Sequence, residues 1–160
     1  MKRPIKDFYY LGVAEAVSRR STCLKRNYGA IIVNNDEIVS TGYNGNPRHL
    51  FNCCDIGECN RINKPHNSGD YSDCYSVHAE QNAIISAARK DMIGGTLYLY
   101  GEDRVYDPRV KDNVNIIINQ PEPCPICMRM ILNAGIERIV TYADSIKENV
   151  MIKTLNEKEW

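Results

Sequence analysis

Two residues near the middle of the chain could take part in metal chemistry. In the segment "SVHAEQNAIISAARK" (76–90), His78 stands two residues before Glu80 at the start of a strongly helix-forming run. If His78 binds a metal ion, Glu80 is placed to carry protons at the open side of that ion. An H-x-E triplet is common by chance, however, so it is equally compatible with an ordinary helix start. The interpretation therefore depends on further ligands elsewhere in the chain.

Cys124 and Cys127 are the partners that His78 needs. They lie two residues apart in "EPCPICMRM", at the predicted start of another helix. This spacing lets two thiolates bind one ion, and the helix N-terminus favours their ionised form. With His78 they make three protein ligands, the number found at a catalytic zinc that keeps its fourth position open. A structural zinc site would not need Glu80, and a redox C-x-x-C would not need His78.

The complete pattern H-x-E…P-C-x-x-C is the signature of zinc-dependent nucleobase deaminases. "SVHAEQNAI" and "EPCPICMRMILNAGIERIVTY" resemble the cytidine deaminase superfamily. With "STCLKRNYGAIIV" and "STGYNGNP", the chain is most similar to the deoxycytidylate (dCMP) deaminases over most of residues 5–143. The resemblance implies that His78, Cys124 and Cys127 bind the catalytic zinc and that Glu80 is the proton shuttle. It also implies one deaminase domain over 1–160, with a three-layer α/β/α fold around a mixed central sheet.

The resemblance extends to residues that would contact the substrate. The backbone around Ala79 matches the segment that contacts the pyrimidine carbonyl, and Asn44 of "GYNG" matches the asparagine that orients sugar and base. Lys25 falls near a basic residue that meets the substrate phosphate in similar proteins, and Arg26 is a neighbouring candidate. Asn-Gly is also a strong turn pair, and a lysine is often simply solvated. Both interpretations of these residues stay open on the sequence alone.

The remaining cysteines suggest a second metal site. Residues 44–73 form a long segment rich in Asn, Gly, Pro, Cys and charge, which needs something to organise it. A closed four-thiolate zinc would tie this segment to the helix that carries His78. The resemblance implies a structural zinc of this kind in many dCMP deaminases, with the ligands Cys23, Cys53, Cys59 and Cys74. Cys54 and His66 are competing ligands, and buried free thiols are the alternative.

Composition limits the classes of function. The chain has 160 residues, enough for one domain, and its 20 basic residues balance 20 acidic ones. Zero net charge argues against obligate binding to long nucleic acid but leaves room for a small anionic substrate. No run approaches the roughly 20 apolar residues of a membrane span, and "MKRPIKDFYY" lacks a signal-peptide core. We therefore expect a cytoplasmic protein, where seven cysteines favour metal ligation over disulfides.

Apolar periodicity and turn residues predict the elements that position these residues. Before residue 144, helices are expected at three places: 4–21, 78–90 and 125–135. Strands are expected at five: 28–33 and 37–43 as a hairpin, then 96–100, a short strand at 114–118, and 137–143. In the first helix one stripe is expected to face the core: Ile5, Phe8, Tyr9, Gly12, Val13, Ala16 and Val17. The last stretch, "DSIKENVMIKTLNEKEW", is expected to be helical.

One segment departs from the family pattern. An insertion, 101–122, lies between the strand at 96–100 and "PCPIC". Its residues Arg104, Tyr106, Arg109 and Lys111 are candidates to reach a substrate phosphate or a neighbouring subunit, and a plain surface loop is the alternative. The insertion is the main reason to consider substrates other than dCMP.

The favoured reaction is hydrolytic deamination of dCMP to dUMP and ammonia, which would supply thymidylate synthesis. The same chemistry on a cytosine nucleoside, another nucleotide, a modified pyrimidine or a base in a polynucleotide is the alternative. A zinc-stapled module without turnover is a further one, although it would have no use for Glu80. The resemblance also implies a homo-oligomer, often a hexamer, and an effect of dCTP or dTTP through the "GYNG" region.

Overall fold

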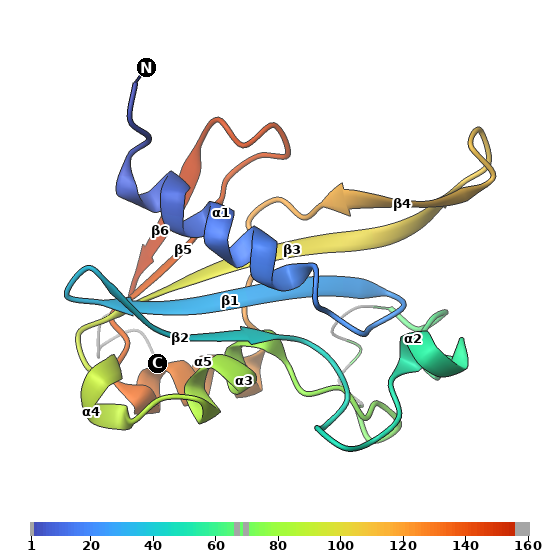
Figure 1. The fold of residues 1–160 in the computed structure, drawn as a ribbon, viewed down its shortest axis with the longest axis horizontal. Helices are drawn as coiled ribbons and strands as arrows, with labels where there is room; N and C mark the ends of the chain where they lie inside the picture. Colours follow the sequence, from blue (N-terminus) through green and yellow to red (C-terminus); the bar gives the residue numbers. More distant parts are fainter. Residues whose placement is uncertain (1, 66–67, 69–70, 156–160) are drawn as a thin grey trace.

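The computed structural model describes residues 2–65, 68 and 71–155. In these residues a six-stranded sheet lies between helices on both faces (Figure 1). Helix α1 (Lys6–Ser18) covers one face, and α3 (Ala79–Ile85) and α5 (Pro125–Ala134) cover the other. The short helices α2 (Cys53–Ile56) and α4 (Arg89–Met92) lie in the connections. This arrangement confirms the predicted three-layer α/β/α fold.

The sheet is mixed, as predicted. Its strand order is β2-β1-β3-β5-β6, and β4 pairs with the outer part of β3. Only β3 and β5 run parallel among the paired strands that the structure describes. The bounds are β1 Arg26–Asn34, β2 Glu37–Tyr43, β3 Thr96–Asp107, β4 Asp112–Ile117, β5 Arg138–Tyr142 and β6 Val150–Thr154.

The central strands are buried on both faces, which explains their nearly continuous apolar sequences. Alternate residues of β1 and β3 point to opposite sides. One set packs against α3 and α5: Ala30, Ile32, Leu97 and Leu99. The other set packs against α1: Ile31, Val33, Tyr98 and Tyr100. Two hydrophobic cores therefore hold the helices on their respective faces.

Two glycines allow helices to approach the sheet closely. A Cβ atom on Gly42 of β2 would lie 2.3 Å from both the carbonyl oxygen of Ala79 and the amide nitrogen of Ala83. A Cβ atom on Gly29 of β1 would lie 2.1 Å from the carbonyl oxygen of Ala14 on the other face. Gly42 therefore sets the height of α3 above the sheet, and with it the position of every side chain at the start of that helix.

The core-facing side of α1 differs from the prediction. The buried residues are Tyr10, Leu11, Ala14 and Ser18, whereas Ile5 and Tyr9 are more than half exposed. Phe8, Val13 and Val17 of the expected stripe are only half-buried. Apolar residues surround most of this helix, so their periodicity does not single out one face. The Tyr10 hydroxyl, which donates to Asp36 Oδ1 at 2.8 Å, helps to hold the observed face toward the sheet.

The expected C-terminal helix is also wrong. Residues 150–154 form strand β6, which pairs antiparallel with β5 along its length. The pairing satisfies backbone groups of β5 that would otherwise lie at the sheet edge, and the β-branched Val150, Ile152 and Thr154 suit a strand. Residues 156–160 of the predicted helix lie outside the described residues.

Two other elements differ in extent. The helix predicted over 78–90 ends at Ile85, where Ser86 occupies the C-cap, and a separate short helix follows at Arg89–Met92. Strand β3 continues to Asp107 and, with β4, forms a hairpin that projects beyond the rest of the sheet (Figure 1). The insertion is therefore an ordered β-hairpin, and the short strand expected at 114–118 is its second arm.

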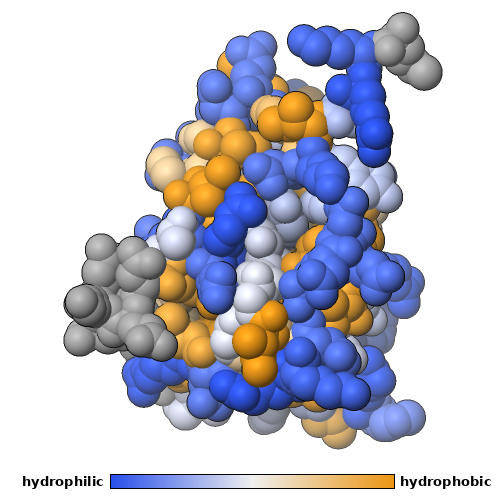
Figure 2. Space-filling view, turned by 90° about the vertical axis from the view of Figure 1, so that its left-hand side faces the viewer, coloured by the Kyte–Doolittle hydropathy of each residue, from blue (hydrophilic) through white to orange (hydrophobic). Residues whose placement is uncertain are grey.

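The surface is mixed in character. Figure 2 shows a face on which apolar side chains form patches separated by polar ones, as is usual for a folded chain. Among the described residues, no helix has both the length and the apolar character required to cross a bilayer.

Candidate active site

Two helix starts on the same face of the sheet hold the predicted metal ligands. His78 is the N-cap of α3, and its backbone N–H donates to Gln81 Oε1 at 2.9 Å. Cys124 is the N-cap of α5, where Pro125 begins the helix. The Cys124 sulfur accepts the backbone N–H of Cys127 at 3.5 Å. Local capping therefore fixes both helix starts from which the three side chains project.

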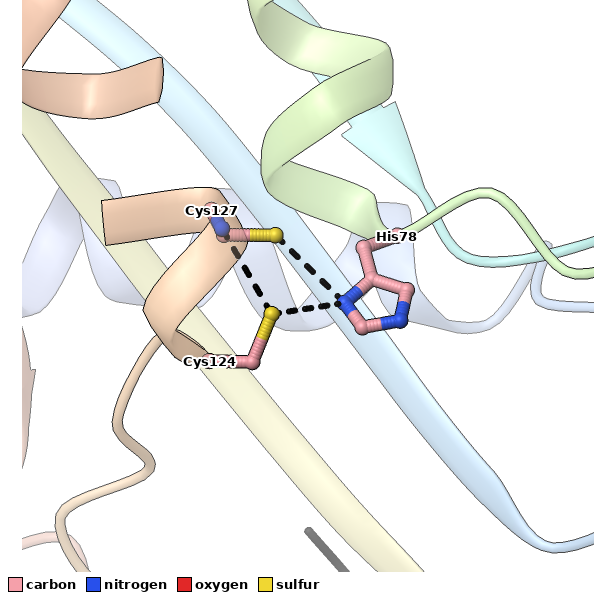
Figure 3. Close-up of side chains that lie close together, drawn as sticks. All are labelled: His78, Cys124 and Cys127. Atoms are coloured by element: carbon pink, nitrogen blue, oxygen red, sulfur yellow. Dashed lines mark hydrogen bonds between the residues drawn. The ribbon is translucent and has the colours of Figure 1, made fainter. Parts of the chain in front are cut away.

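The three side chains converge on one point (Figure 3). The Nδ1 atom of His78 lies 3.6 Å from the Cys124 sulfur and 3.4 Å from the Cys127 sulfur. All three ligand atoms lie within 4.8 Å of one another, and no other group of this kind occurs among the described residues. A tetrahedral zinc with ordinary bond lengths places a nitrogen and a sulfur ligand about 3.6 Å apart. The donor set and its spacing therefore fit zinc.

The charges of the two thiols are coupled. A hydrogen bond from the Cys127 thiol, together with the contact to His78, lowers the pKa of Cys124 to about 3. The neighbouring Cys124 sulfur and burial both raise the pKa of Cys127. One thiolate thus forms readily, while the second needs a cation for its stabilisation. A buried pair of this kind is suited to a divalent metal ion.

Glu80 lies in the first turn of α3 and is 5% exposed. It lines the same pocket as His78 and Cys124 but is not a member of the three-ligand group. Burial raises the pKa of its carboxyl group. A buried carboxyl beside a metal-ligand group, and outside the ligand set, can hold a proton and release it to a bound molecule.

Asn44 and Ala79 both lie at this pocket. The Asn44 side chain is buried, and its Oδ1 accepts hydrogen bonds from Ser21 Oγ and from the Tyr28 amide, both at 2.7 Å. Its Nδ2 donates to the Arg26 carbonyl at 2.8 Å. Asn44 therefore links β1 to the segment at Ser21, and one amide N–H remains for a ligand. The turn interpretation accounts for none of these contacts.

Lys25 and Arg26 also line the pocket, beside the buried Arg61. The ammonium group of Lys25 donates to the carbonyl of Arg61 at 3.0 Å and also contacts the carbonyl of Lys64. Arg26 is paired with Asp103 of β3. The Lys25 side chain thus holds the long loop against the start of β1, and Arg26 is held by Asp103 of β3.

Sequence reasoning missed several residues of the pocket wall, among them Tyr28, Arg61 and Tyr71. The ring of Tyr71 stands edge-on to His78 with centroids 5.8 Å apart, and the Arg61 guanidinium lies 4.4 Å from the Tyr71 ring centroid. Tyr28 could have been found from strand alternation, since it shares a face with Arg26. Arg61 and Tyr71 belong to the long loop, where no periodicity indicates which side chains point inward.

The long loop is closed at its base by paired hydrogen bonds between Gly45 and Val77. Its thiols lie near one another: burial, and then the neighbouring thiols of Cys59 and Cys23, raise the pKa of Cys53. The Cys54 thiol is instead exposed and contacts Asp55. The four predicted ligands of the second site thus share one neighbourhood, although no three of their sulfurs lie within 4.8 Å of one another. His66 lies outside the described residues.

The four candidate residues of the insertion do not line the pocket. Arg109 pairs locally with Asp107 through Nη2 and Oδ2 at 2.6 Å, and Tyr106 and Lys111 are exposed. The backbone N–H of Arg104 donates to the Lys25 carbonyl at 3.0 Å. Within the insertion, Glu122 lines the pocket, and Asp103 pairs with the pocket residue Arg26.

Comparison with known proteins agrees with this geometry. Residues 4–143 match the family described as the cytidine and deoxycytidylate deaminase zinc-binding region. The chain belongs to this deaminase family. The family is defined by a zinc-binding region, and the three converging side chains supply suitable zinc ligands.

Relatives within the deaminase family share most of the chain. A deoxycytidylate deaminase of Mycobacterium phage D29 is 36% identical over 88% of this chain and 96% of the relative. The deoxycytidylate deaminase of Saccharomyces cerevisiae is 34% identical over 92% of this chain, which spans only 40% of that longer protein. A crystal structure of the dCMP deaminase of cyanophage S-TIM5 in complex with dCMP and dUMP is 27% identical, with a TM-score of 0.59 over 87% of this chain and 82% of that one.

Proposed function

We propose that the protein is a zinc-dependent deaminase that converts dCMP to dUMP and ammonia. The observation that carries the proposal is the convergence of His78, Cys124 and Cys127 beside a buried carboxyl group, in a pocket that also holds cationic side chains. Membership of the deaminase family and similarity to deoxycytidylate deaminases support this reaction. In this assignment His78, Cys124 and Cys127 hold the zinc.

The chemistry divides between the metal and the chain. When bound, zinc acts as a Lewis acid that activates water for attack on C4 of the cytosine ring. Glu80 would take a proton from that water and donate it to N3. After the hydroxyl has added to C4, Glu80 would take the remaining hydroxyl proton and pass it to the amine, which leaves as ammonia when the C4–N bond breaks. The backbone around Ala79 contacts the pyrimidine carbonyl, and the free amide N–H of Asn44 orients the sugar. Burial of Glu80 keeps bulk water away from this transfer.

Cationic groups favour a monophosphate as the substrate. Arg26, Lys25 and Arg61 line the pocket together, and arginine in particular binds phosphate through paired N–H donors. The zero net charge of the chain provides no broad field for a polynucleotide. A free nucleotide therefore fits the charge distribution better than a nucleoside or a nucleic acid does.

We also propose a second, structural zinc held by Cys23, Cys53, Cys59 and Cys74. The mutual proximity of these thiols supports it, and the exposure of Cys54 favours Cys53 as the ligand from "NCCD". Cys74 is four residues before His78, so such a zinc would also steady the catalytic ligand.

Three further properties are proposed from the family resemblance. The chain assembles as a homo-oligomer, responds to dCTP or dTTP, and works in the cytoplasm. Light scattering coupled to size-exclusion chromatography tests the assembly, and dCMP saturation curves with and without each triphosphate test the regulation. A monomer, or curves unchanged by either triphosphate, would contradict the corresponding proposal.

Steady-state assays on dCMP, CMP, deoxycytidine and cytosine test the substrate assignment. We expect dCMP to have the highest kcat/KM because only the monophosphates engage the cationic side chains. If deoxycytidine matches dCMP in kcat/KM, the phosphate assignment is wrong and the enzyme is a nucleoside deaminase. If the zinc-loaded protein deaminates none of the four, a non-catalytic zinc module becomes the better account.

A further inference from the structure

A carboxylate at the base of the inserted hairpin contacts the pocket wall. Strand register pairs Asp103 of β3 with Arg26 of β1, and cross-strand partners lie on the same face of a sheet. Arg26 and Tyr28 alternate with Ala30, which packs in the core beneath α3 and α5. The Asp103 carboxylate therefore stands next to the Arg26 guanidinium on the face that carries the active site.

The contacts fix the guanidinium in one orientation. Asp103 Oδ2 accepts from Arg26 Nη2 at 3.0 Å, and its Oδ1 contacts Nε. On the other side, Nη1 donates to the Tyr28 hydroxyl at 3.3 Å. The Arg26 side chain is only 19% exposed. Each terminal nitrogen carries two N–H groups, so each keeps one for a ligand, and the two free donors form a prearranged pair.

We propose that Asp103 is a positioning residue that, through Arg26, sets the preference of the site for a nucleoside monophosphate over a nucleoside. This inference rests on the proposed deamination of dCMP. Without its carboxylate partner, the long Arg26 side chain must be ordered when the phosphate binds, which weakens binding. Removing the carboxylate also removes a negative charge near the phosphate, so the KM for dCMP rises only if the lost ordering of Arg26 outweighs this electrostatic gain.

The insertion thereby acquires a role that its own cations do not suggest. Its outer residues, including the local Asp107–Arg109 pair, lie away from the pocket. Its base supplies one carboxylate that prepares an arginine of the neighbouring strand. Substrate preference would then depend on where the hairpin begins rather than on its tip.

Kinetics with Asp103→Ala and Asp103→Asn test the inference, with Asp107→Ala as the matched control on the same strand and face. For Asp103→Ala we expect the KM for dCMP to rise about tenfold, equivalent to about 1.4 kcal/mol, with kcat within about twofold. The kcat/KM for deoxycytidine should stay within about twofold, because the nucleoside has no phosphate. Asp103→Asn should be intermediate and Asp107→Ala unchanged. An equal loss for both substrates, or an unchanged or lower KM for dCMP, would overturn the inference.

A double-mutant cycle separates positioning from any independent effect. Arg26→Ala should raise the KM for dCMP, and Arg26→Ala with Asp103→Ala should raise it no further. Additive effects would mean that Asp103 does not act through Arg26. The wild-type preference for dCMP over deoxycytidine tests the proposed function separately. If the wild type deaminates neither, calorimetric titration with inorganic phosphate decides: tighter binding by the wild type than by Asp103→Ala supports the inference, and equal binding overturns it.

Discussion

Gly42→Ala should damage the active site without touching any of its side chains. The added Cβ would lie 2.3 Å from backbone atoms of Ala79 and Ala83, where ordinary contact begins at 3.4 Å. Helix α3 must therefore retreat from β2 by about an ångström. This movement shifts His78 away from the two sulfurs of α5, which now lie 3.4 and 3.6 Å from its Nδ1 atom.

The expected cost has two parts. Overpacking of this kind typically lowers the free energy of unfolding by about 1–3 kcal/mol, which would lower the Tm by about 3–10 °C. A displacement of about 1 Å in the catalytic geometry can reduce kcat/KM by about a hundredfold. We expect both losses in Gly42→Ala, together with weaker zinc retention during dialysis against a chelator.

Gly12→Ala is the matched control. Gly12 is an exposed residue of α1, and its added Cβ would meet nothing within 4 Å. Because alanine is the better helix former, this change should stabilise the protein by about 0.5–1 kcal/mol and leave kcat/KM unchanged. Calorimetry, dCMP turnover and zinc content measure all three effects. Wild-type stability and turnover in Gly42→Ala would refute the claim that this close approach sets the position of α3.

Three further changes probe the loop and the surface. Lys25→Met should release the long loop, because the Lys25 ammonium group holds the carbonyls of residues 61 and 64. Limited proteolysis within residues 58–76 should then become at least several-fold faster, and unchanged cleavage would contradict this role. Cys74→Ser should reduce the zinc content from two ions to one per chain, with Cys54→Ser as the unchanged control; one zinc in the wild type would remove the structural site. Hydrogen bonds from Lys6 and Tyr10 lower the pKa of Asp36 in the folded protein. The ionised carboxylate therefore stabilises the fold above the pKa that Asp36 has in the unfolded chain, and this stabilisation is lost as the pH falls through the lower pKa of the folded protein. In thermal melts Asp36→Asn should therefore be less stable than the wild type at neutral pH, and the difference should shrink on acidification below about pH 4; a constant difference would argue against this.

The three candidate zinc ligands could be predicted because they are encoded locally. His78 and the two cysteines stand at helix starts, where spacing and capping determine direction, and the structure brings them together as expected. The layers of the fold could also be predicted, since apolar residues recur with different periods in strands and in helices. These features depend on short-range sequence.

Other features depend on contacts that no local pattern encodes. The buried face of α1 is set partly by the Tyr10–Asp36 hydrogen bond, and β6 forms because β5 offers it an edge. The role of Lys25 as a loop clamp needs carbonyl groups nearly forty residues away. The contact of Asp103 with Arg26 depends on the register of β1 and β3, which the sequence of the insertion does not reveal.

Glu80→Gln tests the central claim most directly. The substitution preserves size and burial but removes the group that takes and returns protons. Mass spectrometry under native conditions should find the same zinc content as in the wild type, while kcat on dCMP should fall by about 10²–10⁴-fold. Retention of turnover within about tenfold of the wild type, with zinc bound, would contradict the assignment of Glu80 as the proton carrier of a zinc-dependent deaminase.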